Sequence, residues 1–198
     1  MRFLHSLWPA RVGLAVLLLV EVLGAAGVLP IQPEFTWKGM ILQDVFVWLV
    51  IEIVAYLIKR HGLNMSLGPA ALLITIQVIV DASGDMGHLY GRFLWYDQIL
   101  HFTGGFTASI LTTGFLQAIH RKKRANSFYH AEILILGAAL AIWGTVLYEL
   151  EEYIEDLLTG SMRLGDGFDT ANDLLLGMFG AILAALIVVK VKRLTSRR

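Results

Sequence analysis

Acidic residues and a histidine recur near the ends of apolar segments at helical spacing. Three pairs are three or four residues apart: Asp97 with His101, Glu149 with Glu152, and Asp169 with Asp173. Residues at these separations lie on one face of an α-helix. Carboxylates with one or two histidines are ligands for magnesium, calcium, manganese, iron or zinc. The spacing therefore predicts a divalent-metal site, of undetermined metal, where these segments meet.

The elements that must position these residues are apolar runs. Of the 198 residues 57% are hydrophobic and only 16% are charged, and the mean hydropathy is +0.67. A membrane-spanning helix needs about 20 apolar residues. The sequence predicts an all-α polytopic membrane protein, one integral membrane domain over 1–198. Its six transmembrane helices are expected at 11–30, 39–58, 67–84, 97–119, 131–153 and 169–190.

The basic residues predict the orientation of these helices. The N-terminus, the second and fourth connections and the C-terminus carry 13 of them, against 3 elsewhere. The 13 are Arg2, Arg11, Lys59, Arg60, Arg121, Lys122, Lys123, Arg124, Lys190, Lys192, Arg193, Arg197 and Arg198. The positive-inside rule then predicts cytoplasmic termini, in a multi-pass protein of the cytoplasmic (inner or plasma) membrane. Residues 1–27 also resemble a cleavable signal peptide, although Glu21 and the apolar run to Leu29 favour a retained helix.

Helix direction predicts two acidic layers near the extracytoplasmic face. Four residues correspond to about 6 Å along a helix, which separates the inner members from the outer ones. The inner layer is expected to contain Asp81, His101, Glu149 and Asp173. The outer layer is expected to contain Asp85, Asp97, Glu152 and Asp169.

Capping offers a simpler interpretation for part of this pattern. Asp97 and Asp169 stand where helices are expected to begin, and an N-cap aspartate accepts free backbone N–H groups. Glu149 and Asp81 instead lie near C-terminal helix ends, where the helix dipole disfavours anions. So many carboxylates need raised pKa values or a cation. The alternatives are a metal site, a proton or ion pathway, and a structural network in which Arg92 and Arg163 balance charge.

Composition also excludes several classes of protein. The chain has no cysteine, so disulfides and thiolate chemistry are absent. With 16 basic and 16 acidic residues the formal charge is zero. The basic run at 121–124 suits a cytoplasmic anchor, so no nucleic-acid partner is predicted and the bilayer is the expected partner. The sequence does not indicate the oligomeric state. For Glu21 and Glu52, which lie within predicted spans, functional and structural roles both stay open.

The favoured functional hypothesis is metal-assisted chemistry on a lipid or envelope substrate. The candidate metal ligands are Asp97, His101, Asp169, Asp173, Asp81 and Asp85. Glu149 or Glu152 would act as general base, and Arg92 and Arg163 would bind substrate or balance charge. The alternatives are a proton or cation transporter and a non-enzymatic structural envelope protein. Histidines are too few for a membrane desaturase, and serine-protease and lipid-phosphatase motifs are absent.

Three segments resemble a family of membrane proteins of unassigned reaction. Residues 96–106, YDQILHFTGGF, resemble the Y-D-x-x-x-H-F-x-x-G-F segment of the YjdF-like inner-membrane proteins. Residues 148–152, YELEE, and 166–173, DGFDTAND, followed by Gly180-Ala181, resemble two further motifs of that family. A looser resemblance extends to VanZ-like membrane proteins, which share an Asp-x-x-x-His, Glu and Asp arrangement. The resemblance implies a helical membrane fold and supports the choice of residues, without implying a reaction.

Overall fold

The computed structural model describes residues 6–123 and 129–195, and this part of the chain is helical without strands. Six helices are long and apolar enough to cross a membrane, by length and composition. The helices are α1 (Trp8–Ala25), α2 (Trp37–Arg60), α3 (Gly68–Met86), α4 (Leu89–Arg92), α5 (Leu94–Lys123), α6 (Tyr129–Thr159) and α7 (Gly167–Thr195). The predicted all-α membrane fold is therefore confirmed.

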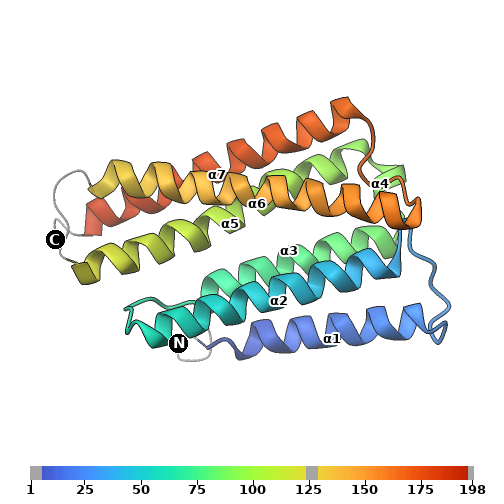
Figure 1. Ribbon diagram of the computed structural model, residues 1–198, viewed down its shortest axis with the longest axis horizontal. Helices are drawn as coiled ribbons and strands as arrows, with labels where there is room; N and C mark the ends of the chain where they lie inside the picture. The colour runs from blue at the N-terminus through green and yellow to red at the C-terminus, as the bar shows by residue number, and fades with distance from the viewer. Residues whose placement is uncertain (1–5, 124–128, 196–198) are drawn as a thin grey trace.

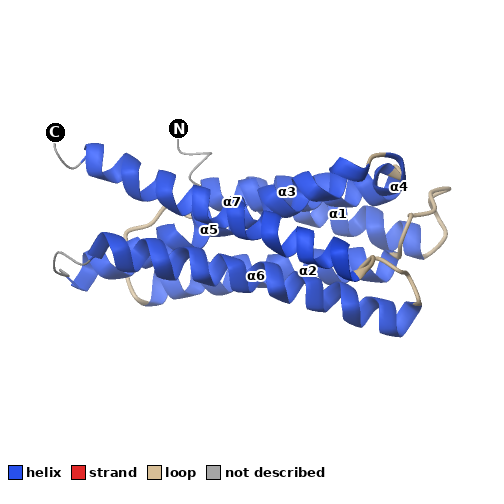
Figure 2. Cartoon of the chain, turned by 90° about the horizontal axis from the view of Figure 1, so that it is seen from above, coloured by secondary structure: helices blue, strands red, loops and turns tan. Residues whose placement is uncertain are grey.

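The long helices run alternately up and down and form two groups of three. In Figure 1, α5, α6 and α7 lie together above α1, α2 and α3. Helix α3 packs on α5 and joins the groups. Viewed from above, the long helices follow one common axis, and short α4 lies at one end of the bundle (Figure 2). We call this the α4 end; it also carries the α1–α2 loop (26–36) and the α6–α7 loop (160–166).

The other end of the bundle carries the start of α1, the α2–α3 loop and the last turns of α7 (Figure 1). This grouping agrees with the predicted separation of the loops into two sets, although cytoplasmic termini stay a prediction. Of the basic residues used for that prediction, Arg2, Arg124, Arg197 and Arg198 lie outside the described residues.

Local sequence signals explain several helix ends. Helix α1 ends at Ala25, earlier than the predicted residue 30, because Gly27 adopts a left-handed φ of 72°. The Val28 N–H then donates to the Leu23 carbonyl at 2.9 Å, the closing bond of a Schellman motif. Helix α2 begins after Thr36, whose hydroxyl accepts the Gly39 N–H at 3.0 Å. Pro9 and Pro69 occupy first turns, where a missing N–H costs little.

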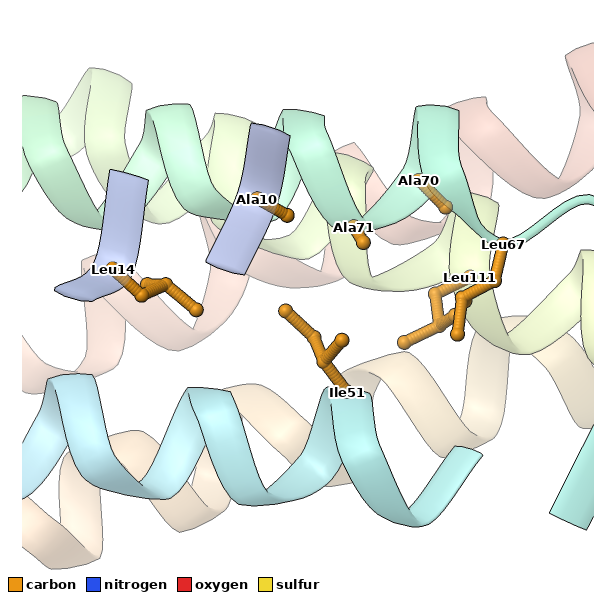
Figure 3. Close-up of a cluster of buried hydrophobic side chains, with 7 residues drawn as sticks. All are labelled: Ala10, Leu14, Ile51, Leu67, Ala70, Ala71 and Leu111. Atoms are coloured by element: carbon orange, nitrogen blue, oxygen red, sulfur yellow. The ribbon is translucent and has the colours of Figure 1, made fainter. Parts of the chain in front are cut away.

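Apolar packing holds α1, α2 and α3 together and connects them to α5. Figure 3 shows the core cluster, with Ile51 of α2 reaching toward α3 and α5. The cluster consists of Ala10, Leu14, Ile51, Leu67, Ala70, Ala71 and Leu111. At the margin of this group Arg11 donates to Glu52 through Nε at 2.6 Å and through a terminal nitrogen at 2.7 Å. Glu52 therefore has a structural partner.

The second group of helices packs through small residues. A Cβ atom added at Gly105 of α5 would collide with the backbone of Gly177 in α7, and one at Gly180 would collide with the carbonyl of Phe102. Such close approach is what small residues permit between membrane helices. It brings α5 and α7 together beside the functional candidates near their first turns.

Candidate functional site

His101 lies between two carboxylates at the α4 end of the bundle. Its Nε2 atom is 3.3 Å from Oδ1 of Asp97, one turn earlier on α5. Its Nδ1 atom is 3.4 Å from Oε1 of Glu149 on α6. The side chains of His101 and Glu149 are each 6% exposed, whereas that of Asp97 is 27% exposed. Asp97 therefore forms the more open side of a buried cluster, which we call the His101 cluster.

Two sets of three potential ligand atoms share this histidine. One set is Asp97, His101 and Asp173; the other is His101, Glu149 and Glu152, and within each set the ligand atoms lie within 4.8 Å of one another. An ion bound at 2.0–2.2 Å separates opposite ligands by about 4.4 Å at most. Small side-chain movements would therefore bring either set to metal-binding distance. These are the only such sets among the described residues.

Several carboxylate oxygens of the cluster have no hydrogen-bond partner. Both oxygens of Glu149 and Oδ1 of Asp173 are buried and accept no hydrogen bond, although Oε1 of Glu149 faces Nδ1 of His101 at 3.4 Å. The residues themselves are only 5% and 3% exposed. Buried polar atoms in folded proteins nearly always have a partner, and an unpaired buried charge is costly. The His101 cluster thus has spare acceptor capacity that a cation or protons would satisfy.

Arg163 forms a second centre beside the His101 cluster. Its Nε donates to Oε1 of Glu152 at 3.0 Å, and a terminal nitrogen donates to the Tyr148 hydroxyl at 2.7 Å. Carboxylate oxygens of Asp81 and Glu155 lie 3.5 Å and 3.8 Å from its terminal nitrogens. We call this group the Arg163 hub. Glu152 belongs to both centres and therefore connects them.

The α6–α7 loop turns back into the bundle to deliver this guanidinium. Asp156 accepts the backbone N–H groups of Arg163 and Leu164 at 2.8 Å and 3.1 Å. Met162 adopts a left-handed φ of 61°, which is uncommon for a residue other than glycine. Burial by itself lowers the pKa of Arg163, but the nearby Tyr148, Asp81 and Glu152 outweigh burial and raise it above its ordinary value. Arg163 is therefore a permanent buried cation.

Asp81 lies in the Arg163 hub. It accepts hydrogen bonds from Gln43 of α2, from the Tyr90 hydroxyl of α4, and from the Tyr148 hydroxyl at 3.1 Å. Burial, and next the charge of Asp81, raise the pKa of the Tyr90 phenol well above its ordinary value, so Tyr90 stays a donor. With four partners Asp81 has little capacity left for a metal. Its depth along α3 predicted that Asp81 lies beside His101, but depth does not specify the direction of a side chain.

Asp85 holds the α1–α2 loop. Its Oδ1 accepts the Phe35 N–H at 2.8 Å, and its backbone carbonyl accepts the Glu34 N–H at 3.1 Å. Arg92 is exposed on α4, and none of the ion pairs among the described residues involves it. A metal-binding role for Asp85 and a charge-balancing role for Arg92 stay predictions.

Asp97 and Asp169 are not N-caps, although both lie in first turns, where the helix dipole favours an acid. Helix α5 begins at Leu94, so Asp97 lies in its first turn, inside the helix. Asp166 caps α7, because its Oδ1 accepts the N–H groups of Phe168 and Asp169 at 2.9 Å and 3.0 Å. Asp169 is exposed, yet Asp97 and His101 act on it electrostatically, which puts it at the rim of the His101 cluster.

Much of the Arg163 hub was not predictable from the sequence. Gln43, Tyr90, Tyr148 and Glu155 were not candidate site residues, and Thr36 donates its hydroxyl hydrogen to Glu155. One signal was present in the sequence: Tyr148, Glu152 and Glu155 recur at intervals of four and three residues and therefore share one face of α6. Gln43 lies on α2 and Thr36 is its N-cap, so spacing along α6 could not predict their contact with the hub.

The fold and these contacts define a polytopic helical membrane protein with a buried cluster of acids and a histidine at one end of its bundle. The chain belongs to the family described as "Predicted membrane protein (DUF2238)", which it matches over residues 11–193. It is also 28% identical over 110 residues to an "Uncharacterized protein" of Thermotoga maritima. That match covers 55% of each chain, so this chain spans about half the length of that curated relative. No solved structure matches the chain.

Proposed function

We propose that this protein binds a divalent cation through Asp97, His101 and Asp173. The observation that carries the proposal is a buried imidazole whose two nitrogens both face carboxylates, beside acidic oxygens without partners. A neutral imidazole offers one lone pair and one N–H group. Binding through Nε2 leaves the Nδ1 hydrogen for Glu149. This is the usual arrangement of a metal-bound histidine oriented by a second carboxylate.

The alternative ligand set, with Glu149 and Glu152, is less suitable. Glu152 already accepts a hydrogen bond from Arg163 at 3.0 Å, and a cation there would lie near a fixed positive charge. Asp97 and Asp173 have no such neighbour among the ion pairs of the described residues, and Asp97 is partly open. Two carboxylates and one imidazole suit zinc, manganese or iron.

We further propose that the cation serves a reaction on a lipid or envelope substrate. A metal ion polarises a substrate oxygen or lowers the pKa of a bound water. Glu149 is the better general base, because its second carboxylate oxygen stays available when Oε1 faces the Nδ1 hydrogen of His101, whereas Glu152 is held by Arg163. Asp169, at the rim beside Asp97, would meet the substrate first or supply a further ligand. The YjdF-like motifs at 96–106, 148–152 and 166–173 contain six of these residues, Asp97, His101, Glu149, Glu152, Asp169 and Asp173, which supports placing the chain with those inner-membrane proteins.

Metal content of the purified protein tests the proposal. Protein prepared without chelators should contain about one divalent ion per chain by elemental mass spectrometry. His101→Gln and Asp173→Asn should lose it, and Glu149→Gln should weaken binding by about 10–100-fold, the usual effect of losing such an orienting carboxylate. His88→Gln is the matched control, because His88 is an exposed histidine at the same end. Metal retained by His101→Gln, or no binding of added zinc or manganese by the wild type, would overturn the proposal.

A structural role is the second candidate, favoured by the Arg163 hub. Its contacts link Phe35 of the α1–α2 loop, Asp81 of α3 and Glu152 of α6 around one guanidinium. If the acidic residues served only this purpose, His101→Gln and Asp173→Asn would change stability and leave metal content unaltered. The same metal measurement, with the free energy of unfolding beside it, therefore separates the two candidates.

A further inference from the structure

A third group of acids lies in the α1–α3 half of the bundle, apart from the His101 cluster. Glu21 of α1 and Asp44 of α2 are both 0% exposed. All four of their carboxylate oxygens lack a hydrogen-bond partner. Glu52, the other acidic residue within these two spans, is instead paired with Arg11. Glu21 and Asp44 are therefore exceptional among the buried acids of this half.

The charged groups that act on Glu21 come from both neighbouring helices. They are Asp44 of α2 and Asp81 and Asp85 of α3, all of them carboxylates. None of the ion pairs among the described residues involves Glu21 or Asp44. Arg163 acts on Asp85 and pairs with Asp81, so its charge is already shared. No side-chain cation is therefore assigned to Glu21 or Asp44.

Two ways of neutralising these acids remain, a bound metal ion or a bound proton. A metal needs several ligand atoms, and both compact three-ligand sets among the described residues contain His101. Glu21 and Asp44 thus offer a metal fewer than three side-chain ligands. A proton needs one oxygen. An ionised carboxylate buried without a partner is strongly unfavourable, and binding a proton removes that cost.

We infer that Glu21 and Asp44 form a buried proton-binding site between α1 and α2. Glu21 lies four residues before the end of α1 and Asp44 seven residues after the start of α2. Both are therefore about 6–10 Å from the α4 end along their helices. Asp81 acts electrostatically on Glu21 and also pairs with Arg163, so the two sites share Asp81 as a neighbour.

Infrared spectroscopy of the whole protein in lipid or detergent tests this site directly. At neutral pH the wild type should show the C=O stretching band of a protonated carboxylic acid, shifted in heavy water. Glu21→Gln or Asp44→Asn should remove part of that band. Glu52→Gln is the matched control, because Glu52 lies in the same helix pair but faces Arg11, and it should leave the band unchanged. A band of equal intensity in the wild type and both variants overturns the inference.

The pH dependence of unfolding gives a second readout if one variant folds poorly. A site that holds a proton in the folded chain but releases it on unfolding makes stability fall as pH rises. The denaturation midpoint of Asp44→Asn should therefore vary less with pH than that of the wild type. An equal pH dependence in the two proteins contradicts the inference. Neither measurement involves a residue of the His101 cluster, so this site and the proposed metal site fail or succeed separately.

Discussion

Arg163→Ala should destabilise the protein more than any other single loss of charge at the α4 end. Arg163 is 8% exposed, donates to Glu152 and Tyr148, and lies within 3.8 Å of Asp81 and Glu155. Removing one partner of a buried ion pair costs about 3–5 kcal/mol, because the remaining charge stays buried. Here three carboxylates would lose their common cation, so we expect at least the lower value. At 1.4 kcal/mol for each tenfold change, the folding equilibrium shifts more than about 100-fold.

Denaturation in mixed micelles, followed by far-ultraviolet circular dichroism, measures this change in the free energy of unfolding. Arg92→Ala is the matched control, because Arg92 is exposed on α4 at the same end, and a surface substitution should stay within about 0.5 kcal/mol. Arg163→Gln combined with Asp81→Asn should recover part of the loss, since it removes one cation and one of its anions together. If Arg163→Ala is as stable as the wild type, or if Arg92→Ala is equally destabilised, the Arg163 hub does not stabilise the α4 end.

Two further predictions concern packing and capping. Gly105→Ala should lower the free energy of unfolding by about 1–3 kcal/mol, the usual effect of overpacking, because its Cβ would collide with the backbone of Gly177. Gly144→Ala is the control, since nothing lies within 4 Å of its added Cβ, and it should raise stability by up to about 1 kcal/mol; equal effects of the two substitutions would contradict the close packing of α5 on α7. Asp166→Ala should lower the free energy of unfolding by about 0.5–2 kcal/mol, because it removes the cap of α7. Asp166→Asn should keep most of that stability, because asparagine also caps helices. The same denaturation measurement tests both substitutions. A free energy of unfolding of Asp166→Ala equal to that of the wild type would show that the cap contributes little to stability.

The apolar runs predicted the six long helices because a bilayer imposes length and composition on every span. The ends of the helices were less predictable, because they depend on local chemistry. Gly27 in a left-handed conformation ends α1, and Asp166 caps the start of α7. Short α4, within the predicted third loop, carried no apolar signal at all. A helix of four residues is too short to produce a recognisable apolar run in the sequence.

The candidate site was predictable only as far as spacing along single helices specifies it. The interval between Asp97 and His101 gives their shared face, and the two residues indeed lie 3.3 Å apart. Which helix faces which is set by the rotation of each helix about its own axis. That rotation brings Gln43 and Tyr148 to Asp81 and directs Asp81 toward Arg163. Helical spacing contains no information about such contacts between distant segments.

The position of Arg163 late in the chain has a consequence for biosynthesis. Its partners Asp81, Glu152 and Glu155 all precede it, and Asp81 does so by a whole half of the bundle. A chain is synthesised from its N-terminus, so Asp81, Glu152 and Glu155 are made before their arginine partner. Only when the α6–α7 loop emerges does the guanidinium become available. The Arg163 hub can therefore form only after α3, α6 and the loop after α6 have all been made.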